Sequence, residues 1–247
     1  MSMFSGMSDQ GMEKQEDRVG GGGFILDTDL YTGRIKAAYV GKSSGGAMSI
    51  TILFTPAGGK EYRETVYITK KTGENFYVKD GKKYPMPGFS LINNLCMIAT
   101  GAPLDQQETE EKVLNIWNSD EKKELPTAVQ VISGLTDAEV TFAIQKVLEN
   151  KSELRGNDYV AIPDTRESNN IVNVIHTESG LTVREAEEGK TEPVYGPAWL
   201  EKNKGQVYDK RTIKDGAAGA PTRPGAAGGA PKSGDAQPRK SLFGNKG

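Results

Sequence analysis

Alternating apolar and polar residues predict β-strands along the first third of the chain. Every second residue from Met48 to Phe54 is apolar, which is the period of a strand with one buried face. The same alternation predicts three further strands, over residues 31–41, 61–71 and 75–79. Gly58-Gly59 and Asp80-Gly81 supply the turn residues of hairpins. We therefore expect a meander of antiparallel strands.

The apolar period changes after Pro87-Gly88. Residues 89–100 have helical spacing and end at Gly101, a residue type that commonly terminates a helix. The segment 139–148 fits helix or strand, and its alternating β-branched and aromatic residues favour a strand. Other strand patterns lie over 112–117, 127–132, 159–162, 171–175 and 181–183, and a helical turn is expected over 198–203.

This order of elements predicts a mainly β fold. Three strands, a helix and further strands follow one another in the same order in an OB-fold. We expect an OB-fold-like antiparallel barrel with one short helix, although a two-sheet sandwich also fits. The domain is expected over 24–213, after a flexible lead-in at 1–23 and before a disordered Gly/Ala/Pro-rich tail at 214–247.

The net charge of −2 conceals two oppositely charged parts. The tail at 214–247 has six basic and two acidic side chains, a net charge of +4, so the rest of the chain carries −6. A domain with that charge does not attract a polyanion as a whole. Any nucleic-acid site must therefore be a local group of basic residues.

Cysteine and histidine are each present once, as Cys96 and His176. One cysteine excludes an internal disulfide and a multi-cysteine zinc site, and we expect it to be a buried structural thiol. We predict no catalytic residue, no metal and no cofactor. The chain has no signal peptide and no apolar stretch of transmembrane length, so we expect a soluble protein of a reducing compartment without a membrane partner.

The segment 61–71 carries the most informative pattern. As a strand it places Val66 and Ile68 on a buried face, and Arg63, Tyr67 and Lys71 on the opposite face. Each cation would then lie about 13 Å from the ring along the strand, at 3.3 Å per residue. A base could stack on the ring while the cations contact neighbouring phosphates.

Aromatic and basic residues continue beyond this strand. Between Lys60 and Tyr84 there are five aromatic residues, and seven basic side chains against four acidic ones. A basic stripe interleaved with rings is typical of single-strand binding that tolerates any sequence. An ordinary solvated strand face fits the same residues about equally well. Glu61 and Glu64 could indicate a metal-dependent nuclease, but no accompanying acidic motif follows them in the sequence. Trp117 is expected in the core.

Eight short peptides, taken in their order, resemble single-stranded DNA-binding proteins of tailed bacteriophages. They cover residues 4–7 (FSGM), 29–36 (DLYTGRIK), 43–48 (SSGGAM), 62–69 (YRETVYIT), 71–77 (KTGENFY), 100–104 (TGAPL), 109–112 (TEEK) and 238–244 (PRKSLFG). The resemblance implies an OB-fold that coats single strands during phage DNA replication, recombination or repair in the host cytoplasm. It implies no enzymatic activity.

The resemblance places the binding face on strands that carry Arg34, Lys36, Arg63, Tyr67 and the segment 70–77. With the neighbouring cations and rings, the candidate DNA contacts are Arg34, Lys36, Lys42, Arg63, Tyr67, Lys70, Lys71, Phe76, Tyr77, Lys82, Lys83 and Tyr84. Replication proteins of this class often end in an acidic tail that recruits partners. The tail of this chain is basic instead, and Leu242-Phe243 are its candidate docking residues.

Two alternatives remain open at the level of sequence. A phage structural or assembly protein, built from a β domain and a flexible arm, fits the same composition. The tail could contact DNA through its scattered cations, or could dock on phage replication or recombination proteins. The sequence does not define an oligomeric state.

Overall fold

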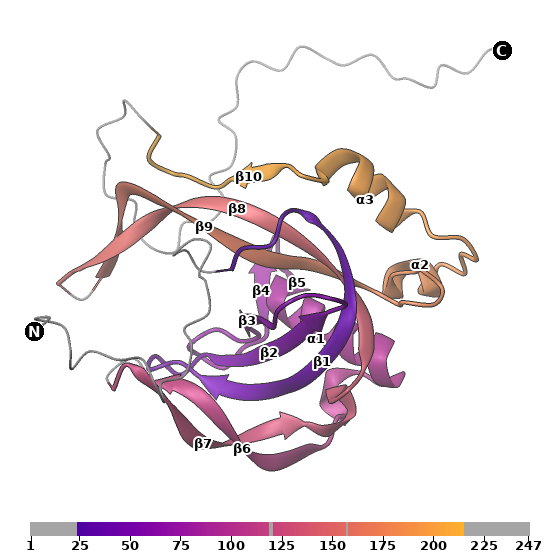
Figure 1. Ribbon diagram of the computed structural model, residues 1–247, viewed down its shortest axis with the longest axis horizontal. Helices are drawn as coiled ribbons and strands as arrows, with labels where there is room; N and C mark the ends of the chain where they lie inside the picture. The colour runs from indigo at the N-terminus through magenta and orange to yellow at the C-terminus, as the bar shows by residue number, and fades with distance from the viewer. Residues whose placement is uncertain (1–23, 119–120, 157, 215–247) are drawn as a thin grey trace, which may run out of the picture.

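A computed structural model describes residues 24–118, 121–156 and 158–214 (Figure 1). The predicted lead-in at 1–23 and the predicted tail, apart from Lys214, lie outside these residues. The β-strands are β1 (Asp29–Lys42), β2 (Met48–Pro56), β3 (Tyr62–Tyr67), β4 (Phe76–Lys79), β5 (Lys82–Pro85), β6 (Thr109–Asn118), β7 (Lys123–Ile132), β8 (Glu139–Arg155), β9 (Asp158–Ile175) and β10 (Val207–Asp209). The α-helices are α1 (Pro87–Thr100), α2 (Val183–Glu187) and α3 (Tyr195–Asn203), with 3-10 turns at Leu104–Gln106 and Ser133–Leu135.

The sheet is built around β1, which pairs with several strands because it bends. Its register with β2 shifts between Ile35 and Ala37, and such a bulge turns a strand. The first half of β1 pairs with β8, and its second half meets β7 at Tyr39. Beyond these, β2 pairs with β3 and β8 with β9, all antiparallel, whereas β10 joins β8 in parallel. The prediction of a mainly antiparallel β fold is confirmed.

The main core lies between the inner face of this sheet and α1. The period-two pattern of β2 is confirmed for Ile50, Ile52 and Phe54, which are buried, but Met48 at the start of the strand is exposed. The ring of Phe54 meets that of Phe142 edge to face, with centroids 4.8 Å apart. The helix α1 contributes Ile92, Leu95 and Cys96 to the core and ends at Gly101 in the left-handed conformation, as predicted.

A second, smaller apolar cluster lies on the outer face of β1 and β2. It contains Ala37, Tyr39 and Val131, packed against partly buried residues that include Leu114 and Ile116 of β6. The β6–β7 hairpin therefore covers part of the outer face, and Figure 1 shows it passing below β1. No helix among the described residues is long and apolar enough to cross a membrane.

The sheet does not close into a barrel through backbone pairing of the described strands. At its open edges, a carboxylate joins β3 to β9: Glu64 Oε2 accepts a hydrogen bond from the Ile171 backbone N–H at 2.8 Å and another from the Tyr62 hydroxyl. Burial raises the pKa of Glu64, although these two hydrogen bonds oppose that shift. Glu64 therefore bridges the two edges of the sheet.

Several predictions for the second half of the chain are wrong. Residues 159–162 and 171–175 are in a strand as predicted, but they are not two short strands: both belong to the single long strand β9, which forms a ribbon with β8 that extends beyond the body (Figure 1). Residues 181–183 are not a strand, because Thr182 caps α2. Residues 24–118, 121–156 and 158–214 contain three α-helices where one was expected, and the short strand β10 had no clear pattern in sequence. The helical turn expected at 198–203 is part of α3.

Candidate nucleic-acid interface

The outer face of β3 carries the residues on which the binding prediction depends. Tyr62 and Val66 are buried, while Arg63, Thr65 and Tyr67 are exposed, so the predicted alternation holds along this strand. The side chain of Tyr67 is 51% exposed. It lies at the last residue of β3, opposite Ser49 of β2.

Neighbouring side chains hold this face in place. Arg63 donates a hydrogen bond from Nη2 to the Tyr39 hydroxyl at 2.9 Å, and Tyr39 itself is buried. The hydroxyls of Thr51 and Thr65 lie 2.8 Å apart across β2 and β3. The guanidinium therefore has a defined position but retains N–H groups that face solvent.

The predicted strand does not continue to Lys71. After Tyr67 the chain turns around Met48, whose backbone N–H donates to Thr69 Oγ1 at 2.9 Å, and Thr69 is buried. Lys71 instead lies beside the β1–β2 turn: a Cβ placed on Gly45 would come within 2.9 Å of its Cε. The simple spacing of 13 Å on each side of the ring is therefore wrong on the Lys71 side.

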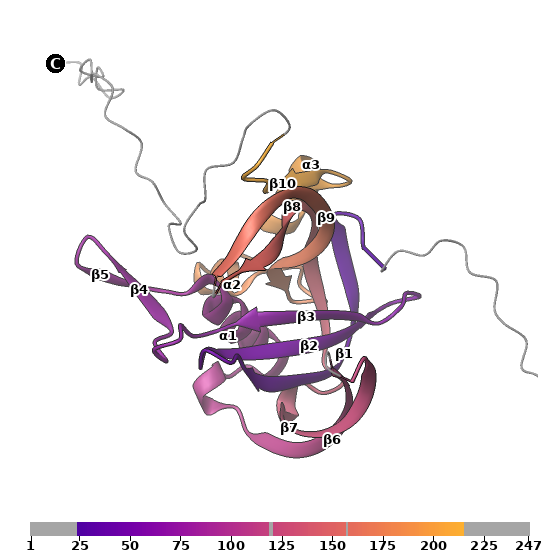
Figure 2. The same cartoon turned by 90° about the vertical axis from the view of Figure 1, so that its left-hand side faces the viewer.

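The hairpin of β4 and β5 presents two further exposed aromatic rings. Tyr77 and Tyr84 are directly paired across the strands and stack with centroids 5.6 Å apart and planes 23° from parallel. Lys79 and Lys82, two residues farther along each strand, share their face. Figure 2 shows the hairpin projecting from the body beyond the end of β3. Lys79 was counted among the basic side chains between Lys60 and Tyr84 but was not among the candidate DNA contacts, although the alternation along the hairpin could have indicated it.

The opposite face of this hairpin is already occupied by cations. Lys83 Nζ lies 4.3 Å from the centroid of the Phe76 ring, and Lys70 Nζ lies 5.8 Å from it. Lys70 also forms an ion pair with Glu74 at 3.2 Å. The Phe76 ring is therefore engaged by cation–π contacts and is a poorer stacking platform than Tyr77 or Tyr84.

Arg34 and Lys36 lie at the other end of the strands. Arg34 pairs with Thr55 of β2, six residues from Ser49, which corresponds to about 20 Å along a strand. Arg34 forms an ion pair with Glu139 at 3.1 Å, and Lys36 forms one with Glu61 at 2.9 Å. The structure therefore does not bring these two residues together with Tyr67.

The remaining cations gather at the Tyr67 end. Within the described ranges, none of Lys42, Lys71, Lys79 and Lys82 has an acidic side chain within ion-pair distance. Together with Arg63, which lies four residues before Tyr67 on the same face of β3, the exposed group at this end is called the Tyr67 surface; it consists of Lys42, Arg63, Tyr67, Lys71, Tyr77, Lys79, Lys82 and Tyr84. It combines unpaired positive charge with three accessible aromatic rings.

Exposed apolar residues elsewhere were missed by the sequence analysis. Trp117, expected in the core, is 55% exposed on β6. Leu154 and Tyr159, paired near the end of the β8–β9 ribbon, are also exposed. A ribbon with solvent on both sides gives no one-sided alternation, so its sequence carries little strand signal.

The single cysteine and the single histidine of the chain both lie within the described part of the fold. Cys96 is buried in α1, as expected, and burial raises the pKa of its thiol to about 12. His176 lies in the turn after β9, where its Nδ1 is 3.0 Å from Ser179 Oγ.

A scan against protein-family models finds no match to this chain, and a search of curated proteins finds none either.

Proposed function

We propose that this protein binds single-stranded DNA non-enzymatically and with little sequence preference, through the Tyr67 surface. The observation that carries the proposal is the gathering of unpaired lysines around exposed tyrosines at one end of an otherwise acidic domain. Every base has a π-face, so stacking on Tyr67, Tyr77 or Tyr84 does not depend on base identity. The lysines supply contacts to phosphates.

The order of strands supports an open OB-fold-like domain as the carrier of this surface. The strands β1, β2 and β3, the helix α1, and then β8 and β9 follow the chain order of that fold, with β6–β7 as an insertion. The edges β9 and β3 approach each other through Glu64 and Ile171, where a barrel would close. With the resemblance to tailed-phage proteins, this supports a role in phage DNA replication, recombination or repair in the host cytoplasm.

A salt titration of binding to a labelled oligothymidine tests the proposal. The Tyr67 surface carries five cations, so full phosphate contact gives a slope of log K against log salt of about −3.5. Replacing Tyr67 by Ala is expected to weaken binding about 10-fold or more, the value of one stacked base. Tyr208, which is also 51% exposed but lies on β10, provides the matched control Tyr208→Ala.

The outcomes separate the proposal from its alternative. Equal weakening by Tyr67→Ala and Tyr208→Ala would show that the Tyr67 surface is not the site. Absence of binding at low salt would overturn the proposal and leave a structural or assembly role. Preference for duplex over single strands would contradict stacking as the mode of contact.

A further inference from the structure

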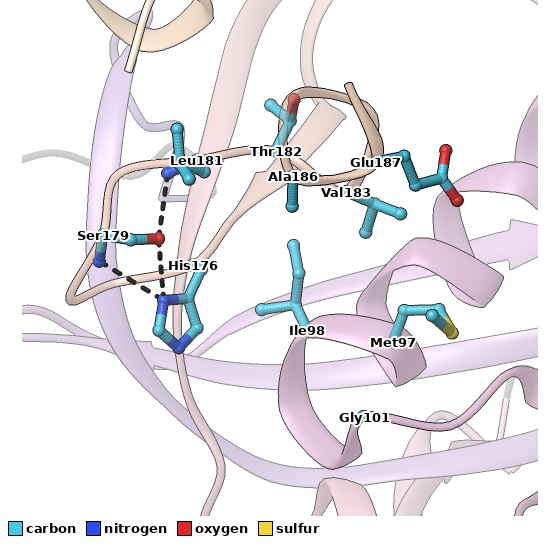
Figure 3. A pocket seen from close by; sticks show the side chains of 10 residues that line it. All are labelled: Met97, Ile98, Gly101, His176, Ser179, Leu181, Thr182, Val183, Ala186 and Glu187. Carbon is cyan, nitrogen blue, oxygen red and sulfur yellow. Dashed lines mark hydrogen bonds between the residues drawn. The ribbon is translucent and has the colours of Figure 1, made fainter. Parts of the chain in front are cut away.

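An apolar pocket lies between α1 and α2 (Figure 3). It has a volume of about 490 Å³, within the range of about 300–1,000 Å³ usual for pockets that bind ligands. Met97 and Ile98 of α1 form one wall, and Figure 3 shows Ile98 pointing toward Val183 and Ala186 of α2.

The wall formed by α2 is fixed by a buried carboxylate. Thr182 and Glu185 form a capping box at the start of this helix. Glu185 also accepts hydrogen bonds from the backbone N–H groups of Val194 and Tyr195, at 2.9 and 2.7 Å. These contacts tie α2 to the start of α3, so the pocket is a built feature of the domain.

The pocket is separate from the Tyr67 surface. The first turn of α1 touches that surface, because a Cβ on Gly88 would lie 2.2 Å from the carbonyl oxygen of Tyr67. Met97 and Ile98 follow about 15 Å farther along the helix, at 1.5 Å per residue. A ligand in the pocket therefore need not displace DNA.

Negative charge accompanies the apolar lining. Glu187 lies at the pocket and is exposed, and Glu178 lies in the turn that leads to it. Within the part of the chain that the structure describes, neither carboxylate has a basic partner. The pocket therefore suits a ligand that is both apolar and basic.

We infer that this pocket binds the segment 239–243 of the same chain, with Leu242 and Phe243 inside and Arg239 and Lys240 at the acidic rim. Among residues 215–247, Leu242 and Phe243 are the two large apolar side chains, and the two cations precede them closely. Fully extended, residues 215–242 span about 90 Å, whereas a domain of this size measures about 40 Å across. The segment can therefore reach the pocket from Lys214.

Methyl NMR of the full chain, labelled with ¹³C at methionine methyls, tests this inference. Met97 lines the pocket, while Met48 and Met86 lie outside it. The change Phe243→Ala is expected to shift the Met97 methyl resonance, assigned with Met97→Leu, and to leave Met48 and Met86 unchanged. Adding a synthetic peptide of residues 236–247 to the Phe243→Ala chain should restore the original Met97 resonance, and the same peptide with Phe243→Ala should not.

Charge reversal gives a second readout. Glu187→Lys alone and Lys240→Glu alone should each reduce the affinity of the pocket for the segment several-fold, and the two together should recover it. An unchanged Met97 methyl resonance in the Phe243→Ala chain would overturn the inference. A Met97 shift that disappears on dilution would also overturn it, because it would mean that the tail of a second copy is bound. A shift at Met48 would overturn it as well, because it would place the segment on the Tyr67 surface. Affinity for oligothymidine, measured in parallel, reports separately on the proposed function.

Discussion

The two ends of strands β1 to β3 are both basic in sequence, but they differ in how their cations are used. At one end Arg34 and Lys36 are neutralised by Glu139 and Glu61. At the other, Lys42 ends β1 and Lys71 lies beside the β1–β2 turn, and neither has an acidic partner among the described residues. The number of basic residues on a strand is therefore the same kind of signal at both ends. We propose that the pairing of each cation with its neighbours determines which end can bind a polyanion.

The aromatic residues differ between the ends in the same way. Tyr62, on the inner face of β3, is 7% exposed, and its hydroxyl donates to Glu64. Tyr67, five residues later on the outer face, is half exposed. Because a strand alternates between its faces, a shift of one residue decides whether a ring belongs to the core or can stack on a base.

The largest expected effect comes from reversing charge at the Tyr67 end. The triple change Lys71→Glu, Lys79→Glu and Lys82→Glu should weaken binding to oligothymidine about 100-fold or more at low salt, because three attractive phosphate contacts become repulsive. Fluorescence anisotropy measures the affinity. The matched variant Arg34→Gln with Lys36→Gln should change it less than about 2-fold. Comparable losses of affinity in both variants would show that the two ends do not differ in DNA binding.

The next effect concerns the bridge between β3 and β9. Glu64→Ala leaves the Tyr62 hydroxyl and the Ile171 N–H without an acceptor, which should lower the free energy of unfolding by about 2 kcal/mol. Glu64→Gln keeps an acceptor oxygen and removes a carboxylate whose charge burial disfavours, so its stability at neutral pH should stay within about 1 kcal/mol of the original. Urea denaturation distinguishes the two. Equal losses would mean that charge, and not hydrogen bonding, matters at this position.

The sequence predicted the first half of the fold well because its strands have one buried and one exposed face. It predicted β2 and β3 from alternation and α1 from its period and Gly101. It did not predict the long strand β9, because much of β9 lies in a ribbon with no core on either side. The capping box of Thr182 and Glu185 was readable in sequence as Thr-x-x-Glu and would have corrected the strand expected there.

The site was only partly predictable for a different reason. Alternation correctly placed Arg63 and Tyr67 on an exposed face. It could not show that the chain turns after Tyr67, since Thr69 becomes buried through a contact with the distant Met48. Nor could it show which cations meet carboxylates from β8, because ion pairs such as Arg34 with Glu139 depend on strand order.

A smaller effect compares the two faces of the β4–β5 hairpin. Tyr84→Ala removes one of the two stacked rings and should weaken DNA binding about 10-fold, the value of about 1.4 kcal/mol for one stacking contact. Phe76→Leu, on the face that Lys83 covers, should change affinity less than about 2-fold. Tyrosine fluorescence quenching by oligothymidine provides an independent measurement. A greater loss for Phe76→Leu would place the DNA on the opposite face of the hairpin.

The smallest expected effect on DNA binding comes from Glu185 of α2, a helix that lines the pocket at the end of α1 away from the Tyr67 surface. Burial opposes ionisation of this carboxyl, but hydrogen bonds from the backbone of Thr182, Tyr195 and Val194 outweigh it and lower its pKa to about 2. A depressed pKa stabilises the folded state above the unfolded value of about 4.3, and this contribution is lost as pH falls toward 2. Glu185→Gln should therefore be less stable at pH 7, with a difference that shrinks between pH 4.5 and pH 2 in thermal melts. Its affinity for oligothymidine at pH 7 should be unchanged; a loss there would show that the α1–α2 region and the Tyr67 surface are coupled.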